Sequence, residues 1–367
     1  MTTAHALFLP RDGTQALIDA LRGAGWRCVG PQVRDHAIVY DDVDDARRLP
    51  WGIRVDQAPG SYRLREGDPQ RAFDWANGPQ CVKPFAFAPQ EVLWRADRRA
   101  DGSLAFRAQK TDAPRIAVIG VRACDLAALA LQDQHFLQGR YADAHYAARR
   151  AALLLVAVDC ARPAATCFCA STGDGPVAGT GFDIALAEID GGFVLRGGTR
   201  AGTVILDRLA LAPATQAQAD AAAAQGAEAA RIQQRRLPGT NLRDTLFARL
   251  DHARWDDVAA RCLACGNCTQ VCPTCFCHSE SDASEPGGRT SVHARQWDSC
   301  FTPGHAYMHG YAVRGDVRSR YRQWLTHKLG GWHDQYGRSG CVGCGRCIAW
   351  CPVGIDITEE AQALCAP

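Results

Sequence analysis

Eight of the 18 cysteines in this chain occur in two copies of one short pattern. Residues 262–273 read CLACGNCTQVCP, and residues 341–352 read CVGCGRCIAWCP. Each copy is C-x2-C-x2-C-x3-C-P, the spacing with which bacterial ferredoxins hold [4Fe-4S] clusters. The short gaps wrap one loop around three corners of a cube, and Gly266, Gly343 and Gly345 let the backbone come close to it. The pattern therefore predicts two iron–sulfur clusters.

In such a doubled pattern the fourth cysteine of each copy binds the other cluster. The first ligand set is then Cys262, Cys265, Cys268 and Cys351. The second ligand set is Cys341, Cys344, Cys347 and Cys272. Two zinc sites are the alternative, but zinc sites usually show two separated C-x2-C pairs. Four cysteines followed by proline, found twice, favour the clusters.

Four further cysteines follow two predicted strands. Residues 115–120 (RIAVIG) and 152–158 (ALLLVAV) are short apolar runs, and a helix with Asp125 as its expected N-cap lies between them. Strand, helix and strand predict a βαβ unit with a parallel core, and ligands gather at the carboxyl ends of such strands. The cysteines at these ends form the amino-terminal thiol set: Cys124, Cys160, Cys167 and Cys169. Four thiols suffice for a third [4Fe-4S] cluster, although a zinc site or simple buried or reactive thiols are alternatives.

The remaining pattern predicts an α/β amino-terminal domain with a βαβ core, followed by an α+β dicluster ferredoxin-like domain with a long helical insert. We expect the first domain at 1–210, a helical linker at 211–260 and the ferredoxin-like domain at 261–367, with its insert at 274–340. Within these, residues 56–81 have a loop-like composition, residues 203–207 (TVILD) form a short apolar run, and residues 241–260 have the pattern of one helix.

The insert repeats a motif of the first domain. Thr-Cys-Phe-Cys occurs at 166–169 and again at 274–277, ahead of a Ser-, Glu- and Gly-rich stretch expected to be a loop. Cys275, Cys277 and Cys300 are three thiols, one fewer than the four that a [4Fe-4S] cluster uses. They are either structural thiols or compete with the amino-terminal thiol set as ligands. Residues 316–329 predict an amphipathic helix, whose basic face is either solvated or a docking surface.

Composition restricts the function. Of the 367 residues, 47% are hydrophobic and 22% are charged, with a net charge of only +2, which gives no argument for nucleic acid or an anionic membrane as a partner. The longest aliphatic run is too short to span a bilayer, and the first residues lack a secretory signal. Cysteines at metal-ligand spacing rather than in a disulfide framework indicate a reducing cytoplasm.

Together, several segments resemble a known family. They are CLACGNCTQVCPTCFC, RQWDSC, RSRYRQWLTHKL and GCVGCGRCIAWCPVGIDIT, with GVRACDLAAL, HYAARR and VDCARPAATCFCASTGDGP nearer the amino terminus. This combination, over about residues 115–360, is similar to the iron–sulfur beta subunit of cytoplasmic sulfhydrogenase-type, NAD(P)-linked [NiFe] hydrogenases. The iron–sulfur subunit that feeds electrons to anaerobic sulfite reductase is similar in the same places.

The resemblance implies a non-catalytic electron-transfer subunit. It would pass single electrons between a flavoprotein that binds FAD and NAD(P) and the small subunit of a [NiFe] hydrogenase, whose large subunit completes the complex. The eight ferredoxin-type cysteines would be cluster ligands, and the amino-terminal thiol set matches cysteine motifs of the family. An electron-feeding subunit of a sulfite reductase is the alternative. A free-standing ferredoxin is disfavoured by chain length, and a DNA-repair protein by the absence of a basic patch.

Overall fold

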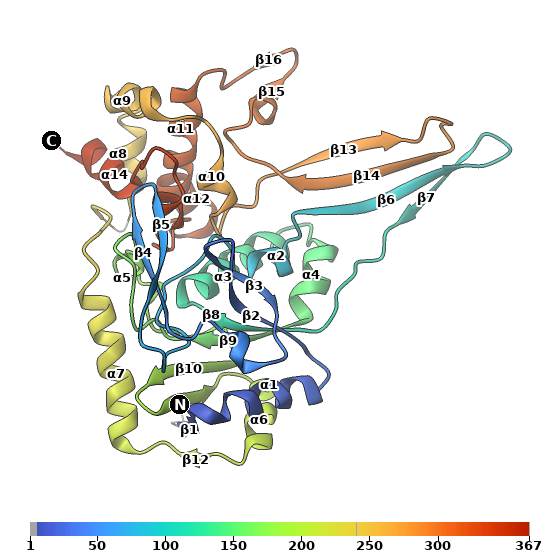
Figure 1. Cartoon of the computed structure of the whole chain (residues 1–367). Coiled ribbons are helices and arrows are strands. Elements are labelled where there is room, and N and C mark those ends of the chain that lie inside the picture. Colours follow the sequence, from blue (N-terminus) through green and yellow to red (C-terminus); the bar gives the residue numbers. More distant parts are fainter. Residues whose placement is uncertain (1–5, 240, 367) are drawn as a thin grey trace.

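An eight-stranded sheet is the base of the molecule in the computed structural model, which describes residues 6–239 and 241–366 (Figure 1). Its strand order is β12-β1-β11-β10-β9-β8-β2-β3. Strands β2, β8, β9 and β10 are parallel to their neighbours in this group, and the outer strands pair antiparallel. The bounds are β1 Leu7–Pro10, β2 Arg27–Arg34, β3 Ala37–Asp42, β8 Ile116–Val121, β9 Leu153–Val158, β10 Ile184–Ile189, β11 Gly192–Gly197 and β12 Ala212–Pro213.

The expected strand–helix–strand unit is present at the centre of this sheet. Strand β8 leads into α3 (Ala123–Leu137) and α4 (Ala144–Ala151), and the chain returns as β9 parallel to β8. Alternate residues of β8 and β9 enter two separate cores, one beneath α1 (Thr14–Gly23) and α6 (Arg200–Leu206), the other beneath α3 and α4. Helices therefore cover both faces, as a parallel sheet requires.

The region of the doubled cysteine pattern is mainly helical and lies above the sheet in Figure 1. Its helices are α8 Arg243–Phe247, α9 Arg254–Arg261, α10 Asn267–Gln270, α11 Val317–Thr326, α12 Trp332–Tyr336, α13 Arg346–Ala349 and α14 Ile357–Cys365. All of them except α12 contribute to one apolar core, which includes Leu246, Trp255, Trp324, Ile348 and Leu364. Helix α7 (Gln216–Arg231) runs up the side of the molecule between the sheet and this region, and a capping box from Thr215 and Gln218 begins it.

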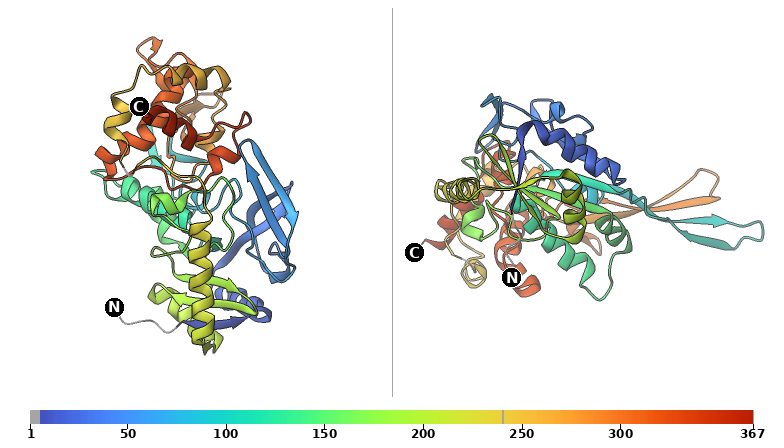
Figure 2. Two further views of the ribbon diagram at one scale, coloured as in Figure 1. Left: turned by 90° about the vertical axis from the view of Figure 1, so that its left-hand side faces the viewer. Right: turned by 90° about the horizontal axis from the view of Figure 1, so that it is seen from below.

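A four-stranded sheet projects from the body as an arm (Figures 1 and 2). Its order is β13-β14-β6-β7, with β6 at Gln90–Arg98, β7 at Leu104–Ala108, β13 at His278–Ser284 and β14 at Thr290–Trp297. Strand β14 pairs antiparallel with β6, although the two lie about 200 residues apart in the sequence. The expectation of a loop after residue 277 and of a wholly helical insert was therefore wrong. A strand in the first domain supplies the backbone partner that the local composition could not reveal.

Three other local expectations were wrong, and one short apolar run is helical. Residues 56–81 include the hairpin β4 (Ile53–Ala58) and β5 (Ser61–Glu66). Residues 203–207 are mostly in α6, which Thr199 caps by accepting a hydrogen bond from the Gly202 backbone. The helix expected at 241–260 is divided into α8 and α9, and Leu250 is 36% exposed in the break. The N-cap of α3 is Arg122 and not Asp125, which lies inside the first turn.

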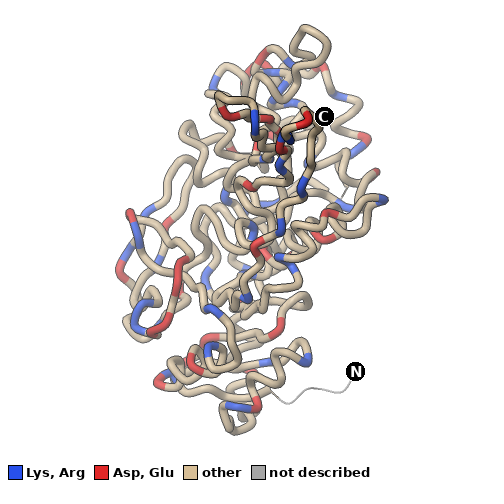
Figure 3. Tube along the Cα trace, turned by 90° about the vertical axis from the view of Figure 1, so that its right-hand side faces the viewer, with Lys and Arg blue, Asp and Glu red and all other residues tan. Residues whose placement is uncertain are grey.

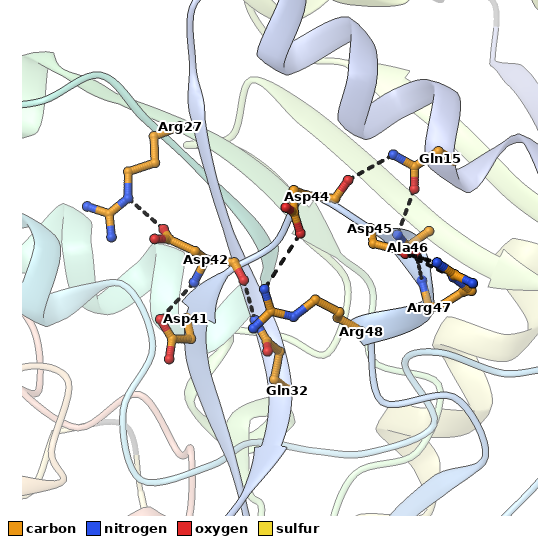
Figure 4. A network of polar contacts seen from close by, with 10 residues as sticks. All are labelled: Gln15, Arg27, Gln32, Asp41, Asp42, Asp44, Asp45, Ala46, Arg47 and Arg48. Carbon is orange, nitrogen blue, oxygen red and sulfur yellow. Dashed lines mark hydrogen bonds and ion pairs between the residues drawn. The ribbon is translucent and has the colours of Figure 1, made fainter.

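Charged residues of both signs are interspersed along the chain (Figure 3), and some of them form ion pairs at the surface. Figure 4 shows one such network, in which Gln15 of α1 accepts a hydrogen bond from the Ala46 backbone and Arg27 pairs with Asp42 at 2.5 Å. Within the described residues, no helix is long and apolar enough to cross a membrane.

Candidate iron–sulfur centres

The first ligand set lies at the outer side of the helical region. Cys262 follows α9, Cys268 lies in α10, and Gly266, with φ +75°, makes the turn between them. The four thiols line one cavity together with Phe301, Tyr321 and Trp324. Two backbone groups donate hydrogen bonds to ligand sulfurs, Ala264 N to Cys262 Sγ at 3.4 Å and Ile355 N to Cys351 Sγ at 3.3 Å. Such N–H donors stabilise the negative charge of a thiolate-bound cluster.

The second ligand set has the same local geometry in a more buried place. Gly345, with φ +72°, precedes the short helix α13 just as Gly266 precedes α10. Burial raises the pKa of Cys347, and the neighbouring thiols Cys341, Cys344, Cys272 and Cys268 raise it further, so Cys347 lies near both cysteine runs. Cys272 differs, because a hydrogen bond from Cys275 and the nearby charge of Lys328 lower its pKa well below the usual range.

The two ligand sets differ in their access to solvent. Cys265 is exposed and the neighbouring Leu263 is 63% exposed, whereas Cys341 and Cys344 are both buried. The first ligand set therefore faces the surface, and the second is covered by other parts of the chain.

Part of this cover is the loop at residues 166–169. The Phe168 backbone donates a hydrogen bond to Gly343 O at 2.8 Å. A Cβ on Gly343 would lie 2.5 Å from the backbone of Phe168, and one on Gly345 would lie 2.4 Å from Thr166 O. Only glycine permits this approach, so the glycines expected to serve a cluster also serve the contact with the first domain.

All four cysteines of the amino-terminal thiol set are buried at this contact. Cys124 lies in the first turn of α3, Cys160 follows β9, and Cys167 and Cys169 lie in the loop and in α5 (Cys169–Thr172). Burial raises the pKa of Cys169 to about 12, with added effects of Cys160 and Cys344. Gln233 Nε2 also donates a hydrogen bond to Cys169 Sγ at 3.4 Å. The structure thus brings this set together, beside Cys344 of the second ligand set.

A buried arginine connects these thiols to α3. Arg346 of α13 is 1% exposed, and its Nη2 pairs with Asp125 Oδ2 at 2.8 Å while its Nε donates to Gly78 O at 2.8 Å. Its Nη1 is buried and has no partner among the described residues. The charges of Cys344 and Cys124 are among the influences on its pKa. An unpartnered donor at this place fits an anionic group bound between the thiols.

Sequence reasoning missed two lysines near the second ligand set. Lys83 and Lys328 are each 4% exposed, and Lys328 Nζ donates a hydrogen bond to Thr274 Oγ1 at 2.8 Å. Neither has a spacing relative to a cysteine motif that would have marked it.

In the described part of the chain, no group of three or more His, Cys, Asp or Glu side chains is placed to hold a single metal ion.

Comparison with known proteins agrees with this geometry. Residues 261–355 match the family described as 4Fe-4S dicluster domain. The chain is 29% identical over 307 residues to Sulfhydrogenase 2 subunit beta of Pyrococcus furiosus, which covers 81% of this chain and 86% of that protein. No solved structure matches the chain significantly. The chain is therefore an iron–sulfur protein with a carboxyl-terminal 4Fe-4S dicluster domain, and its expected resemblance to the iron–sulfur beta subunits of sulfhydrogenases is confirmed.

Proposed function

We propose that this chain is the electron-transfer subunit of a cytoplasmic, NAD(P)-linked [NiFe] hydrogenase. Its partners are a flavoprotein that binds FAD and NAD(P), and the hydrogenase small subunit with its large subunit. One observation carries the proposal: the first ligand set opens to the surface, and the second lies beneath it and beside the amino-terminal thiol set. Ligand sets in such an order would extend from the surface into the protein. [4Fe-4S] clusters held there would take up and release single electrons.

The chain's own residues would hold the cluster charges and exclude water. Backbone N–H groups of Ala264 and Ile355 donate to ligand sulfurs of the first set. Around the second set, the loop of residues 166–169 replaces solvent by protein. Because burial and hydrogen bonds to sulfur both change a cluster's reduction potential, we expect the two centres to differ in potential.

We further propose that the amino-terminal thiol set holds a third [4Fe-4S] cluster. Four buried thiols, the hydrogen bond from Gln233 and the unpartnered Nη1 of Arg346 support it. Anaerobically reconstituted protein should then contain about four irons fewer when Cys167 and Cys169 are both replaced by Ser. An unchanged iron content in this variant would show that these cysteines are not ligands.

The function is tested by separating the partial reactions of the purified complex. Cys265→Ala and Cys344→Ala should abolish nicotinamide-linked hydrogen oxidation, since each removes a ligand from one of the two sets. Hydrogen oxidation with a dye that takes electrons directly from the hydrogenase subunits should persist. The matched control is Cys365→Ala, a partly exposed cysteine of α14 outside all the ligand sets. Full nicotinamide-linked activity in a variant shown to lack one cluster would refute the proposal.

The partners are tested by anaerobic purification from the native host. Co-purification of a flavoprotein with large and small [NiFe] subunits is the expected result. A sirohaem protein in their place would instead assign the chain to sulfite reduction, and would leave the cluster ligands unchanged.

A further inference from the structure

A third group of cysteines lies at the root of the projecting arm. Cys277 immediately precedes β13, and Cys300 follows β14 by three residues. The β13–β14 ladder pairs His278 with Trp297, and the Asp298 backbone then donates to Cys277 O at 2.9 Å. The ladder thus holds the segments of Cys277 and Cys300 together, and Cys275 lies two residues before Cys277. We call Cys275, Cys277 and Cys300 the hairpin thiol set.

The hairpin thiol set also adjoins the second ligand set. Thr274 is fully buried, and its Oγ1 donates to Gly340 O at 2.7 Å, next to Cys341. Its Oγ1 also lies 3.2 Å from Cys272 Sγ. Both Thr-Cys-Phe-Cys segments of the chain therefore pack against the second cysteine run. At the first of them, the cysteines belong to a set of four buried thiols.

The three thiols influence one another and their neighbours. Burial raises the pKa of Cys300 to about 12, and the charge of Cys277 raises it as well. The neighbouring Cys272 raises the pKa of Cys275, and burial and the charge of Cys277 raise it further. Cys268 of the first ligand set is in turn affected by Cys300. The hairpin thiol set therefore lies within reach of both ligand sets of the dicluster domain.

Two buried ammonium groups face these thiols. The polar contacts of Lys328 Nζ are Thr274 Oγ1 at 2.8 Å and Gly340 O at 3.5 Å, and Lys83 Nζ contacts Cys272 O at 3.3 Å. Each ammonium group also lies over a ring, Lys83 at 3.8 Å from Trp297 and Lys328 at 4.7 Å from Trp332. All these partners are uncharged. Buried charges require a compensating charge. Cys272 and Cys341 of the second ligand set supply part of it, and Cys275 and Cys277 of the hairpin thiol set adjoin the same ammonium groups.

We propose that Cys275, Cys277 and Cys300 hold an additional iron–sulfur cluster with three cysteine ligands, and that Lys83 and Lys328 balance its negative charge. Three thiolates bind three iron atoms of such a cluster, which leaves either a three-iron cluster or one iron with a ligand other than cysteine. The site lies between the hairpin root and the dicluster domain, so it would connect the arm electronically to the first and second ligand sets. The proposal does not depend on which oxidoreductase the chain serves.

The test is an iron and acid-labile sulfide count on the anaerobically reconstituted full-length chain. The Cys277→Ser/Cys300→Ser variant should lose about three to four irons and a matching amount of sulfide relative to the wild type. The Cys365→Ser control should lose none, and the loss should add to that of Cys167→Ser/Cys169→Ser. An unchanged count would overturn the proposal, as would a loss of bound zinc without loss of sulfide.

Two replacements of Cys300 separate ligand loss from misfolding. A carboxylate can bind cluster iron and a methyl group cannot, so Cys300→Asp should retain the iron that Cys300→Ala loses. The electron paramagnetic resonance spectrum of reduced Cys300→Asp should also differ from that of the wild type in one component only. Equal iron contents in the two variants would overturn the proposal even if both are less stable. Neither measurement needs a partner subunit, so this inference can fail while the hydrogenase assay succeeds, and the reverse also holds.

Discussion

The buried ion pair of Arg346 and Asp125 should be the costliest single polar contact to break between the dicluster domain and α3. Both side chains are 1% exposed, and their charged atoms lie 2.8 Å apart. Arg346→Met would leave the Asp125 carboxylate buried without a partner and would also free Gly78 O. Removal of one member of a buried pair typically costs about 3–5 kcal/mol of unfolding free energy. We expect a loss in this range.

The exposed pair of Arg27 and Asp42 is the matched control. Its side chains are 53% and 56% exposed, so Arg27→Met should cost no more than about 1 kcal/mol. Anaerobic urea unfolding followed by tryptophan fluorescence gives the difference, provided that the slope against urea is unchanged. Iron content is measured on the same samples, because Arg346 adjoins the ligand Cys347.

A double variant distinguishes an unpaired charge from the loss of a cluster. Asp125→Leu/Arg346→Met removes both charges, and replacement of a complete buried pair by apolar residues is often close to neutral. Its stability should therefore lie well above that of Arg346→Met alone. If the double variant is as unstable as the single one, the loss does not come from the uncompensated carboxylate, and the reasoning is refuted.

Two further predictions concern the cover of the second ligand set. Gly345→Ala and its control Gly337→Ala both place a side chain at a positive φ, +72° and +75°, but only at Gly345 would the new Cβ meet backbone, 2.4 Å from Thr166 O. Gly345→Ala should therefore lower the free energy of unfolding in urea by about 1–3 kcal/mol more than Gly337→Ala does. Equal losses would contradict the close approach. His135 stacks on Phe276 with ring centroids 3.6 Å apart, and burial lowers the pKa of His135 in the folded protein. The contribution of neutral His135 to stability is therefore complete above its unfolded pKa near 6.5. This contribution is lost as the pH falls from 6.5 toward the lower folded pKa. The melting temperature should therefore fall less between pH 7.5 and 5.5 in His135→Gln than in the wild type, and an equal fall would show that His135 does not titrate on unfolding.

Sequence reasoning recovered the features that depend on local spacing. In each of the two cysteine runs the backbone turns at a glycine with positive φ, Gly266 in the first and Gly345 in the second. Strands β8 and β9 each consist of six buried residues, which form continuous apolar runs in the sequence. The helix with Tyr321, Trp324 and Leu325 on its buried side also agrees with its periodicity. In each case the residues that determine the structure are neighbours in the chain.

What sequence reasoning could not recover depends on partners far along the chain. Residues 278–284 (HSESDAS) have a composition typical of a loop, and they form a strand because β14 pairs with them and with β6. Lys83 and Lys328 are 245 positions apart, and only the fold places both beside Cys272. The break between α8 and α9 likewise involves a contact that no periodicity reveals, the hydrogen bond from Trp255 Nε1 to Arg249 O.

The burial of the second ligand set explains why the chain is much longer than a ferredoxin. The two cysteine runs are nearly equivalent in sequence, yet Cys265 is exposed while Cys341 and Cys344 are buried. The difference comes from two segments with the same four residues, 166–169 from the first domain and 274–277 from the insert, which pack against the second run through Gly343 and Gly340. A small carrier needs only one exposed centre to exchange electrons in solution. A chain that encloses its second centre between further thiols is suited instead to electron transfer through its interior.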